Sequence, residues 1–229
     1  MINVLFVLTS HDQLGETGQK TGFWIEEFAT PYYALTDAGV VVTLSSPKGG
    51  QPPIDPKSDA PENQTESTKR FKQDQALQEK LSLTMKLSDT FADEFDAVFF
   101  PGGHGPMWDL NKDPNVTRLV QNFHRQNKFI AAVCHGPAAL LNAKGDNGEL
   151  LIKGKKVTGF TNTEEEAVKL TKVVPFLLED ALKAAGAGYS KKDDWQSYTV
   201  QDGQFLTGQN PASSEQVAKD LLQLLKVAG

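Results

Sequence analysis

The sequence predicts an α/β fold in which a central, mostly parallel sheet is covered by helices on both faces. Short apolar runs such as Val4–Leu8 and Phe129–Val133 alternate with longer segments of helical spacing, a pattern typical of a sheet buried on both sides. There is no internal repeat, and 39% hydrophobic with 23% charged residues is a globular composition. We expect one domain over residues 1–229, with ligand sites at the carboxyl ends of the strands.

The first part of the chain contains two predicted strands and one helix. The apolar run from Ile2 to Leu8 has no basic region before it and is too short to span a bilayer, so we expect a buried strand over Val4–Leu8. Gly22–Asp37 carries an apolar stripe at helical spacing and predicts an amphipathic helix, which Pro31 should kink. Val40–Leu44 is the second predicted strand.

A segment from Ser46 to about Phe95 interrupts this alternation. It begins with a cluster of turn-forming residues, namely Pro47, Gly49, Gly50, Pro52, Pro53 and Pro56. Helical spacing returns between Phe71 and Met85. Because a structureless loop of this length would be unusual, we expect a small helical insertion over about 46–95 that could cover the cleft as a lid.

The remaining elements follow in regular order. The predicted strands are Ala97–Phe100, Phe129–Val133, Val157–Gly159 and the pair Tyr198–Val200 and Phe205–Thr207. The predicted helices are Pro114–Gln126, Gly136–Asn142, Thr163–Leu170, Phe176–Ala185 and a closing helix that Ser213 or Ser214 can cap. Asp202-Gly203 lies between the last two strands and is a strong signal for a tight hairpin turn.

The charge and the cysteine content restrict the class of protein. The net charge of -6 and the pI near 5.3 count against nucleic acid or an anionic membrane as the main partner, because both would call for a basic surface. Cys134 is the only cysteine, so no internal disulfide can form and nothing calls for an oxidising compartment. We expect a cytoplasmic protein that acts on a small molecule.

Cys134 follows directly on the apolar run Phe129–Val133 and is the most informative residue of the chain. A small residue, Ala132, stands two positions before it, and Gly136 stands two positions after it. This spacing matches a nucleophile elbow, a sharp strand-to-helix turn that projects its nucleophile into a cleft. The amides that begin the next helix are expected to lower the pKa of the thiol. A buried structural cysteine is the alternative, but the position favours a nucleophile.

Histidine supplies the candidate base. His135 is adjacent to Cys134 and is the natural general base, with a capping or packing role as the alternative. His11, His104 and His124 are isolated in the sequence, and none of them has a metal-ligand spacing with Cys134. We therefore expect neither a metal nor another cofactor.

A glycine-rich loop, Pro101–Gly105, follows the predicted strand Ala97–Phe100. In a parallel sheet this loop lies at the same edge as the cysteine. Because glycine lets backbone amides approach a substrate oxygen closely, Gly102 and Gly103, with the amide of His135, are candidates for an oxyanion hole. A phosphate cradle or a plain turn are the alternatives, but neither a P-loop lysine motif nor G-x-G-x-x-G is present.

Two sets of glutamates are candidate acids. On the predicted helix Gly22–Asp37, Glu26 projects away from the apolar stripe and Glu27 lies on its flank. A carboxyl group partly buried there should have a raised pKa, so Glu27 could donate a hydrogen bond to a cysteine thiolate, unless its head reaches solvent. Residues 164–166 are all glutamate at a helix start that Asn162 or Thr163 can cap, which is reason enough for acids. Any one of the three could instead orient His135.

Four stretches together resemble the ThiJ/PfpI superfamily, a group of class I glutamine amidotransferase-like proteins. They are Thr9-Ser10 with Lys20–Glu27, Phe99–Gly105, Ala131–Ala138, and Thr158–Thr161 with Thr207–Ser213. These stretches extend over nearly the whole chain, and the segment around Cys134 is the most specific of them. Within the superfamily the chain looks like the branch of glutathione-independent glyoxalase III and heat-inducible chaperone proteins.

The resemblance implies a flavodoxin-like three-layer sandwich and a homodimer. It implies a catalytic triad of Cys134, His135 and Glu165, the acid lying six residues past Gly159, with Glu27 beside the thiol. Members of this branch convert 2-oxoaldehydes such as methylglyoxal into 2-hydroxy acids such as lactate, without glutathione or metal. The yeast members have a different residue at the position of Glu164.

Other functions remain as alternatives. In a holdase chaperone Cys134 need not react, and in a stress sensor it would be oxidised rather than catalytic. An amide hydrolase or amidotransferase would use the same elbow, but such enzymes of the superfamily carry His-x-Glu near the C-terminus. Here that region reads Gln209-Asn210-Pro211 and contains no histidine.

Overall fold

The computed structural model describes residues 1–227, so the last two residues of the predicted domain lie outside it. At its centre is a seven-stranded sheet in which every neighbouring pair is parallel except β8 and β9. In spatial order the strands are β3 (Met85–Lys86), β2 (Val41–Ser46), β1 (Asn3–Val7), β4 (Ala97–Phe100), β5 (Phe129–Val133), β9 (Phe205–Gly208) and β8 (Thr199–Asp202). The predicted, mostly parallel sheet is confirmed.

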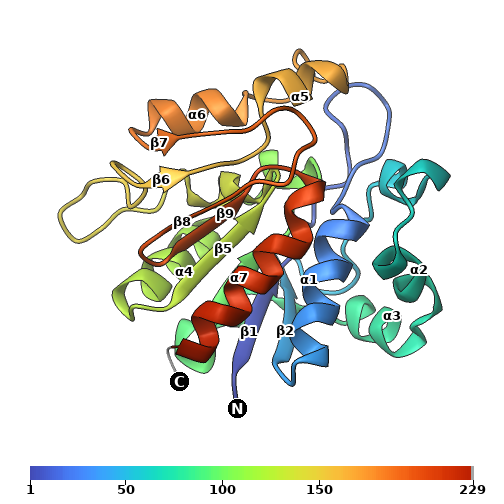
Figure 1. Cartoon of the computed structure of the whole chain (residues 1–229), viewed down its shortest axis with the longest axis horizontal. Helices are drawn as coiled ribbons and strands as arrows, with labels where there is room; N and C mark the ends of the chain where they lie inside the picture. Colours follow the sequence, from blue (N-terminus) through green and yellow to red (C-terminus); the bar gives the residue numbers. More distant parts are fainter. Residues whose placement is uncertain (228–229) are drawn as a thin grey trace.

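Helices cover both faces of the sheet, as the predicted three-layer sandwich requires (Figure 1). On one face α1 (Ile25–Asp37) packs along α7 (Ser214–Val227), and α7 also contacts β5 and β9. On the other face α4 (Pro114–Arg125) packs on β4 and β5. Fully buried aromatic rings fill the space between sheet and helices, for example Phe6 against Phe99 with ring centroids 4.7 Å apart.

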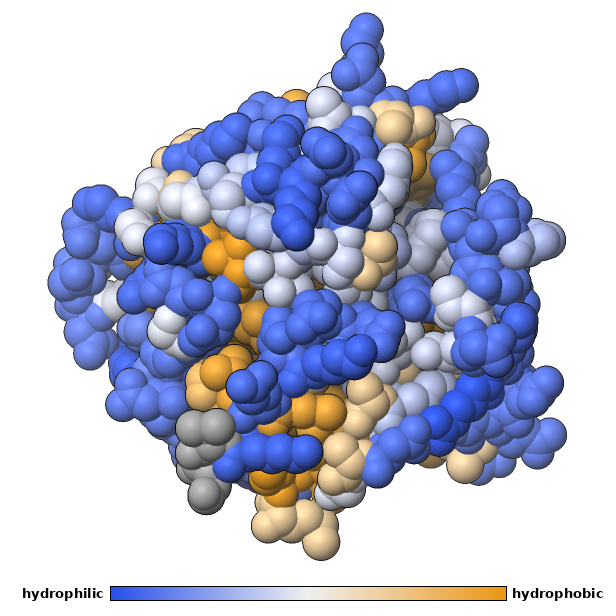
Figure 2. Space-filling view, viewed as in Figure 1, coloured by the Kyte–Doolittle hydropathy of each residue, from blue (hydrophilic) through white to orange (hydrophobic). Residues whose placement is uncertain are grey.

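The carboxyl ends of the parallel strands lie at the end of the sheet away from both chain termini (Figure 1). Short elements gather beyond them, namely α5 (Asn162–Ala167), α6 (Leu178–Ala184), β6 (Lys156–Val157) and β7 (Gly188–Tyr189). The space-filling view is mostly hydrophilic, with apolar side chains gathered near the two termini (Figure 2). No helix of the described chain is long and apolar enough to cross a membrane.

The segment between β2 and β4 forms two helices rather than one. These are α2 (Glu66–Gln73) and α3 (Gln75–Ser82), so the helical spacing noted between Phe71 and Met85 belongs to two helices, and it continues past the end of α3 at Ser82. Asp74 causes the break, because its side chain accepts a hydrogen bond from the amide of Leu77 at 2.9 Å and so caps α3. Two short 3₁₀ turns, Pro56–Asp59 and Pro61–Asn63, precede α2, which packs against α1.

Three other helix boundaries differ from the sequence prediction. The helix expected from Gly22 begins at Ile25, because the backbone of Phe23 is extended and bonds with Pro53 and Asp55 instead. After the elbow, Gly136–Leu140 is a 3₁₀ helix rather than a helix to Asn142. The cap of α5 is Thr161, one residue before the predicted caps.

The last strands form the expected hairpin. Asp202 pairs with Phe205 across a two-residue turn in which Gly203 has a φ of 58°. Strand β9 also pairs in parallel with β5 and brings Gly208 opposite Val133. The C-terminal third of the chain is thereby joined to the edge of the sheet at which Cys134 lies.

Candidate active site

Cys134 lies in a strained turn between β5 and the 3₁₀ helix Gly136–Leu140. Its φ is 60°, in the left-handed region that non-glycine residues rarely adopt, as at a nucleophile elbow. Its amide donates to the carbonyl of Gly208 and its carbonyl accepts from the amide of Phe160, which fixes the backbone on both sides. Gly136 is needed at the turn because a Cβ there would lie 2.1 Å from the carbonyl oxygen of Phe100.

Cys134, His135 and Glu165 form a continuous chain of contacts. The sulfur lies 3.4 Å from Nδ1 of His135, and Nε2 of that ring lies 2.7 Å from a carboxylate oxygen of Glu165. Because an ionised carboxylate can only accept, Nε2 carries the proton, and Nδ1 is left as an unprotonated acceptor facing the thiol. Of the three glutamates that the sequence left open, Glu165 is the one that contacts His135.

His104 is a second histidine on the same carboxylate. Its Nε2 lies 2.7 Å from the other oxygen of Glu165, and its ring centroid is 4.1 Å from that of His135. His104 is isolated in the sequence, because 61 residues separate it from Glu165. Its place at the end of a predicted strand was the signal that could have drawn attention to it.

Glu165 and His135 adopt complementary protonation states. Burial acts to raise the pKa of Glu165, but the two imidazoles outweigh it and hold that pKa well below its usual range. Burial lowers the pKa of His135, and neighbouring His104 lowers it further, against the opposite effect of Glu165. The resting arrangement is therefore an anionic Glu165 with a neutral His135.

Glu27 is a buried acid next to the thiol. Its side chain is 0% exposed, and burial raises its pKa to about 8, against smaller opposite effects of the Cys134 thiol and the amides of Gly102 and Gly103. Within the described chain neither of its oxygens has a partner at full hydrogen-bond geometry. An uncompensated buried carboxylate would be costly, so Glu27 is protonated at neutral pH and can donate a proton or a hydrogen bond.

The pKa of the Cys134 thiol is raised, and the predicted lowering by a helix N-terminus is wrong. Burial is the largest cause, followed by the negative charge of Glu27 when that group ionises. The short 3₁₀ helix that follows supplies a much weaker dipole than a full α-helix would. The thiol is therefore neutral at rest, and forming a thiolate needs a base within reach.

The glycine loop packs tightly against the elbow. A Cβ on Gly102 would lie 2.4 Å from Glu27 and 2.8 Å from the amide nitrogen of His135, and Gly103 has a φ of 88°. Both positions require glycine. The loop thus lies at the same edge as Cys134, as expected, with the amides of Gly102 and Gly103 near the Glu27 carboxyl. The oxyanion role of Gly102, Gly103 and His135 stays a prediction.

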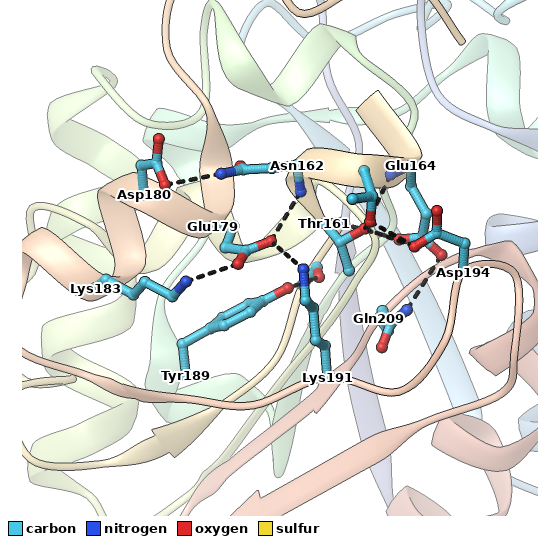
Figure 3. Close-up of polar contacts among 12 residues, drawn as sticks. Thr161, Asn162, Glu164, Glu179, Asp180, Lys183, Tyr189, Lys191, Asp194 and Gln209 are labelled. Carbon is cyan, nitrogen blue, oxygen red and sulfur yellow. Dashed lines mark hydrogen bonds and ion pairs between the residues drawn. The ribbon is translucent and has the colours of Figure 1, made fainter. Parts of the chain in front are cut away.

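Glu164 is anchored in a polar cluster with Thr161 and Gln209 (Figure 3). One of its oxygens accepts hydrogen bonds from the backbone of Trp195 and the side chains of Gln209 and Asn210, at 2.7 to 3.1 Å. The other accepts from the amide of Thr161, whose hydroxyl caps the helix in return. The spacing Thr161-x-x-Glu164 is a capping-box pattern and could have separated this acid from Glu165. The third glutamate, Glu166, is exposed.

Glu179 secures the start of α5 from the other side (Figure 3). It is 3% exposed and accepts a hydrogen bond from the amide of Asn162 at 2.8 Å. Lys183 and Lys191 pair with its two oxygens at 2.7 and 3.1 Å. Together with Glu164 it fixes the helix that carries Glu165.

A cavity of about 620 Å³ opens in front of these groups. Cys134, His135, His104 and Glu27 line its floor. Its apolar wall consists of Trp24, Phe160, Val168, Trp195, Pro211 and Ala212. The segment between β2 and β4 contributes Lys57, Ala60, Glu62, Asn63, Gln64 and Thr65. A concave, largely apolar site with convergent polar groups is typical of small-molecule binding.

The same floor contains one set of metal-type ligands. One ligand atom each from His104, His135 and Glu165 lies within 4.8 Å of the others, so these residues could hold a divalent cation. The two 2.7 Å contacts to Glu165 are hydrogen bonds that account for this spacing without a metal.

Comparisons with known proteins identify the family to which the chain is similar. A model of the DJ-1/PfpI family matches residues 20–224. Glutathione-independent glyoxalase HSP31 of Saccharomyces cerevisiae is 30% identical, with 97% of this chain and 98% of the relative aligned. The structure of glyoxalase III from Candida albicans is similar with a TM-score of 0.90 and 28% identity, covering 97% of this chain and 96% of that one. The structure of Rapid Encystment Protein 24 kDa from Francisella tularensis is similar with a TM-score of 0.94 and 44% identity, covering 98% of this chain and 99% of that one.

Proposed function

The chain belongs to the DJ-1/PfpI family, and we propose that it is a glutathione-independent glyoxalase. It would convert 2-oxoaldehydes such as methylglyoxal into 2-hydroxy acids such as lactate. The observation that carries the proposal is the unprotonated Nδ1 of His135 beside the Cys134 thiol, with Glu165 behind the ring. Relatives and structural neighbours that align over nearly the full chain and are named as glyoxalases support the same activity.

The first step forms a carbon–sulfur bond. His135 takes the thiol proton on Nδ1, and the resulting imidazolium is stabilised by the anionic Glu165. The sulfur of Cys134 attacks the aldehyde carbon, and the aldehyde oxygen becomes an oxyanion near the amides of Gly103 and His135. This oxygen takes the proton back from His135 and leaves a hemithioacetal.

The second step is an internal oxidation and reduction. His135 removes the hydrogen from the former aldehyde carbon and an enediol forms. The proton is returned to the adjacent carbon, and the hydroxyl proton of the hemithioacetal passes to the oxygen of that carbon. The first carbon is oxidised to a thioester while the ketone carbon is reduced to an alcohol, so no external oxidant is consumed. Protonated Glu27 donates a hydrogen bond to the sulfur throughout.

The last step is hydrolysis of the thioester on Cys134. Water adds its oxygen to the carbonyl carbon, the carbon–sulfur bond breaks, and the sulfur regains one proton. The products are the 2-hydroxy acid and the free thiol. The overall reaction adds one water to the 2-oxoaldehyde and requires no glutathione.

Purified protein should form lactate from methylglyoxal in the absence of glutathione. Cys134→Ala should abolish this activity. Glu165→Gln should lower kcat/KM by about 100-fold, because the neutral amide cannot stabilise the imidazolium, whereas the exposed neighbour Glu166→Gln should not change it. Equal lactate yields from the wild-type and Cys134→Ala proteins would end this proposal.

Two observations weigh against the alternatives. The Cys134 side chain is 3% exposed and its thiol pKa is raised, whereas ready oxidation favours an exposed thiolate. Gln209 and Asn210, which stand where an amidotransferase would carry histidine, instead bind Glu164. The homodimer that the resemblance implies and the cytoplasmic location expected from the cysteine content belong to the same proposal, and sedimentation analysis tests the first of them.

A further inference from the structure

We propose that His104 is a second catalytic imidazole, the base that activates water to hydrolyse the thioester on Cys134. The inference rests on the proposed glyoxalase function and assigns its last step to a residue that the Cys134–His135–Glu165 triad does not include. It starts from an unusual feature of the site, in which one carboxylate orients two imidazoles.

Hydrogen bonding fixes the tautomer of His104. Its Nε2 faces the anionic Glu165 at 2.7 Å, so in the neutral imidazole the proton is on Nε2 and Nδ1 is left as an acceptor. Within residues 1–227 no protein group hydrogen-bonds this Nδ1, and the residue lines the cavity. A base oriented by an adjacent carboxylate is the arrangement that general base catalysis uses. Glu165 orients His104 and His135 in the same way, with Nε2 of each ring 2.7 Å from one of its oxygens.

Burial separates the tasks of the two rings. His135 is 0% exposed and packs between His104 at 4.1 Å and Phe160 at 4.4 Å, with its Nδ1 against the sulfur. An acyl group attached to that sulfur would lie against Nδ1 of His135, 3.4 Å from the sulfur, and we expect it to keep water away from that nitrogen. His104 is 8% exposed at the cavity wall and remains accessible. Water that attacks the thioester from the cavity therefore meets His104 first.

The proton balance of the step is simple. Nδ1 of His104 takes one proton from water while the water oxygen bonds to the thioester carbon. The tetrahedral intermediate breaks its carbon–sulfur bond and the thiolate leaves, hydrogen-bonded by Glu27. The proton on His104 then passes to the thiolate, which restores the free thiol and a neutral imidazole. Glu165 stabilises the transient charge on His104 as it does that on His135.

A purely structural role for His104 makes a different prediction. In that case the ring would only hold Glu165 in place, and any side chain that donates to the carboxylate would serve. His104→Gln separates the two roles, because its amide N–H can donate to Glu165 but the side chain has no basic nitrogen. His11→Gln is the matched control, since His11 contacts neither the cavity floor nor Glu165.

Rapid mixing of His104→Gln with methylglyoxal, followed by intact-protein mass spectrometry, tests the proposal. We expect the thioester adduct on Cys134 to form at close to the wild-type rate and then to accumulate, with its hydrolysis slowed about 100-fold. Hydroxylamine, added after the methylglyoxal has been removed, cleaves thioesters without a protein base and should release the adduct as a hydroxamic acid with return of the free thiol. A variant that turns over like the wild-type and His11→Gln proteins, with no adduct, would overturn the assignment.

The experiment distinguishes a failure of the proposed glyoxalase function from a failure of the His104 assignment. If wild-type protein makes no 2-hydroxy acid from any 2-oxoaldehyde, the proposed function fails first; if it does and His104→Gln shows no adduct, only this inference fails. Should His104→Gln not fold, decay of the adduct on wild-type protein can be compared in H₂O and D₂O. Slower decay in D₂O is expected for a base that removes a proton from water, and equal rates would contradict it.

Discussion

At the scale of single residues, Cys134 and Glu27 are two buried acids that both keep their protons at neutral pH. Burial raises the pKa of each, and the negative charge of an ionised Glu27 would raise the pKa of the Cys134 thiol further. The thiol is therefore activated only when His135 takes its proton as the substrate is attacked. Such a site protects its sulfur from oxidation between turnovers, because the thiolate is the form that reacts with oxidants.

The raised pKa of Glu27 predicts a pH dependence of stability. Its value is about 8 in the folded protein and 4.5 is its ordinary value, so between these two pH values the folded state holds a proton that the unfolded state has lost. The contribution of Glu27 to the free energy of unfolding is fully present below about pH 4.5. It falls by about 1.4 kcal/mol per pH unit as the pH rises toward the pKa of Glu27 in the folded protein. Glu27→Gln resembles the protonated acid and removes this loss.

Urea denaturation of both proteins at pH 5.5 and 7.5 measures the effect. The wild-type protein should lose roughly 3 kcal/mol more than Glu27→Gln between these two pH values, because all other titrating groups are shared. Any constant cost of the amide cancels in this comparison. Parallel losses in the two proteins would show that Glu27 ionises in its ordinary range.

At the scale of elements, α5 is a short helix held by two buried carboxylates, Glu179 and Glu164, of which Glu164 also contacts the cavity wall. Glu164 accepts four hydrogen bonds, three of them from the segment between Trp195 and Asn210. Trp195, with a φ of 64°, forms part of the cavity wall and contacts Phe160 with ring centroids 5.8 Å apart. Glu164 therefore connects the helix of Glu165 to one wall of the substrate site.

Glu164→Gln should destabilise the protein by about 1–3 kcal/mol. The glutamine NH2 group cannot accept a hydrogen bond, so at least one of the donors that now bind the carboxylate would lose its partner. KM for methylglyoxal should rise as the Trp195 segment loosens. Glu166→Gln on the same helix is exposed and should change the free energy of unfolding by less than about 0.5 kcal/mol. Denaturant midpoints and steady-state kinetics measure both effects, and equal behaviour of the two variants would exclude this role of Glu164.

The elbow at Cys134 could be predicted from the sequence, whereas the helix break at Asp74 and the raised pKa of the thiol could not. The elbow was predictable because its determinants, a buried strand, Cys134 and the required Gly136, lie within eight residues of one another. Asp74 was missed because the apolar spacing continues across it, although a side-chain cap there starts a new helix. The raised pKa of the thiol could not be predicted, since it depends on burial and on Glu27 from a distant helix.

At the scale of the whole molecule, the parallel order of the sheet is what assembles the site. Adjacent β4 and β5 place the loop of His104 beside Cys134, and this topology was predictable from the alternation of strands and helices. The pairing of His104 with Glu165 across 61 residues was not, because neither residue has a local signal for the other. The position of the segment between β2 and β4 likewise depends on tertiary contacts.

The segment between β2 and β4 is attached to α1 through a hydrogen bond between Thr65 and Glu26. The Thr65 hydroxyl donates to Glu26, which also accepts from Thr30 at 3.0 Å, and Thr65 caps α2 by accepting from the amide of Thr68. Thr65 and Glu26 both line the cavity, and Glu26 is the neighbour of Glu27. A lid role for the segment, proposed from its place in the sequence, would depend on this contact.

Thr65→Ala should therefore raise KM for methylglyoxal severalfold while kcat stays close to the wild-type value, because the segment helps to enclose the substrate but holds none of the reacting groups. Loss of the helix cap should cost about 1 kcal/mol of stability. Thr65→Ser keeps a hydroxyl at the same place and should restore both values, which separates the hydrogen bond from the bulk of the side chain. If KM for Thr65→Ala matches that of Thr65→Ser, the segment between β2 and β4 does not act as a lid, and the cavity binds its substrate through the β-strand loops alone.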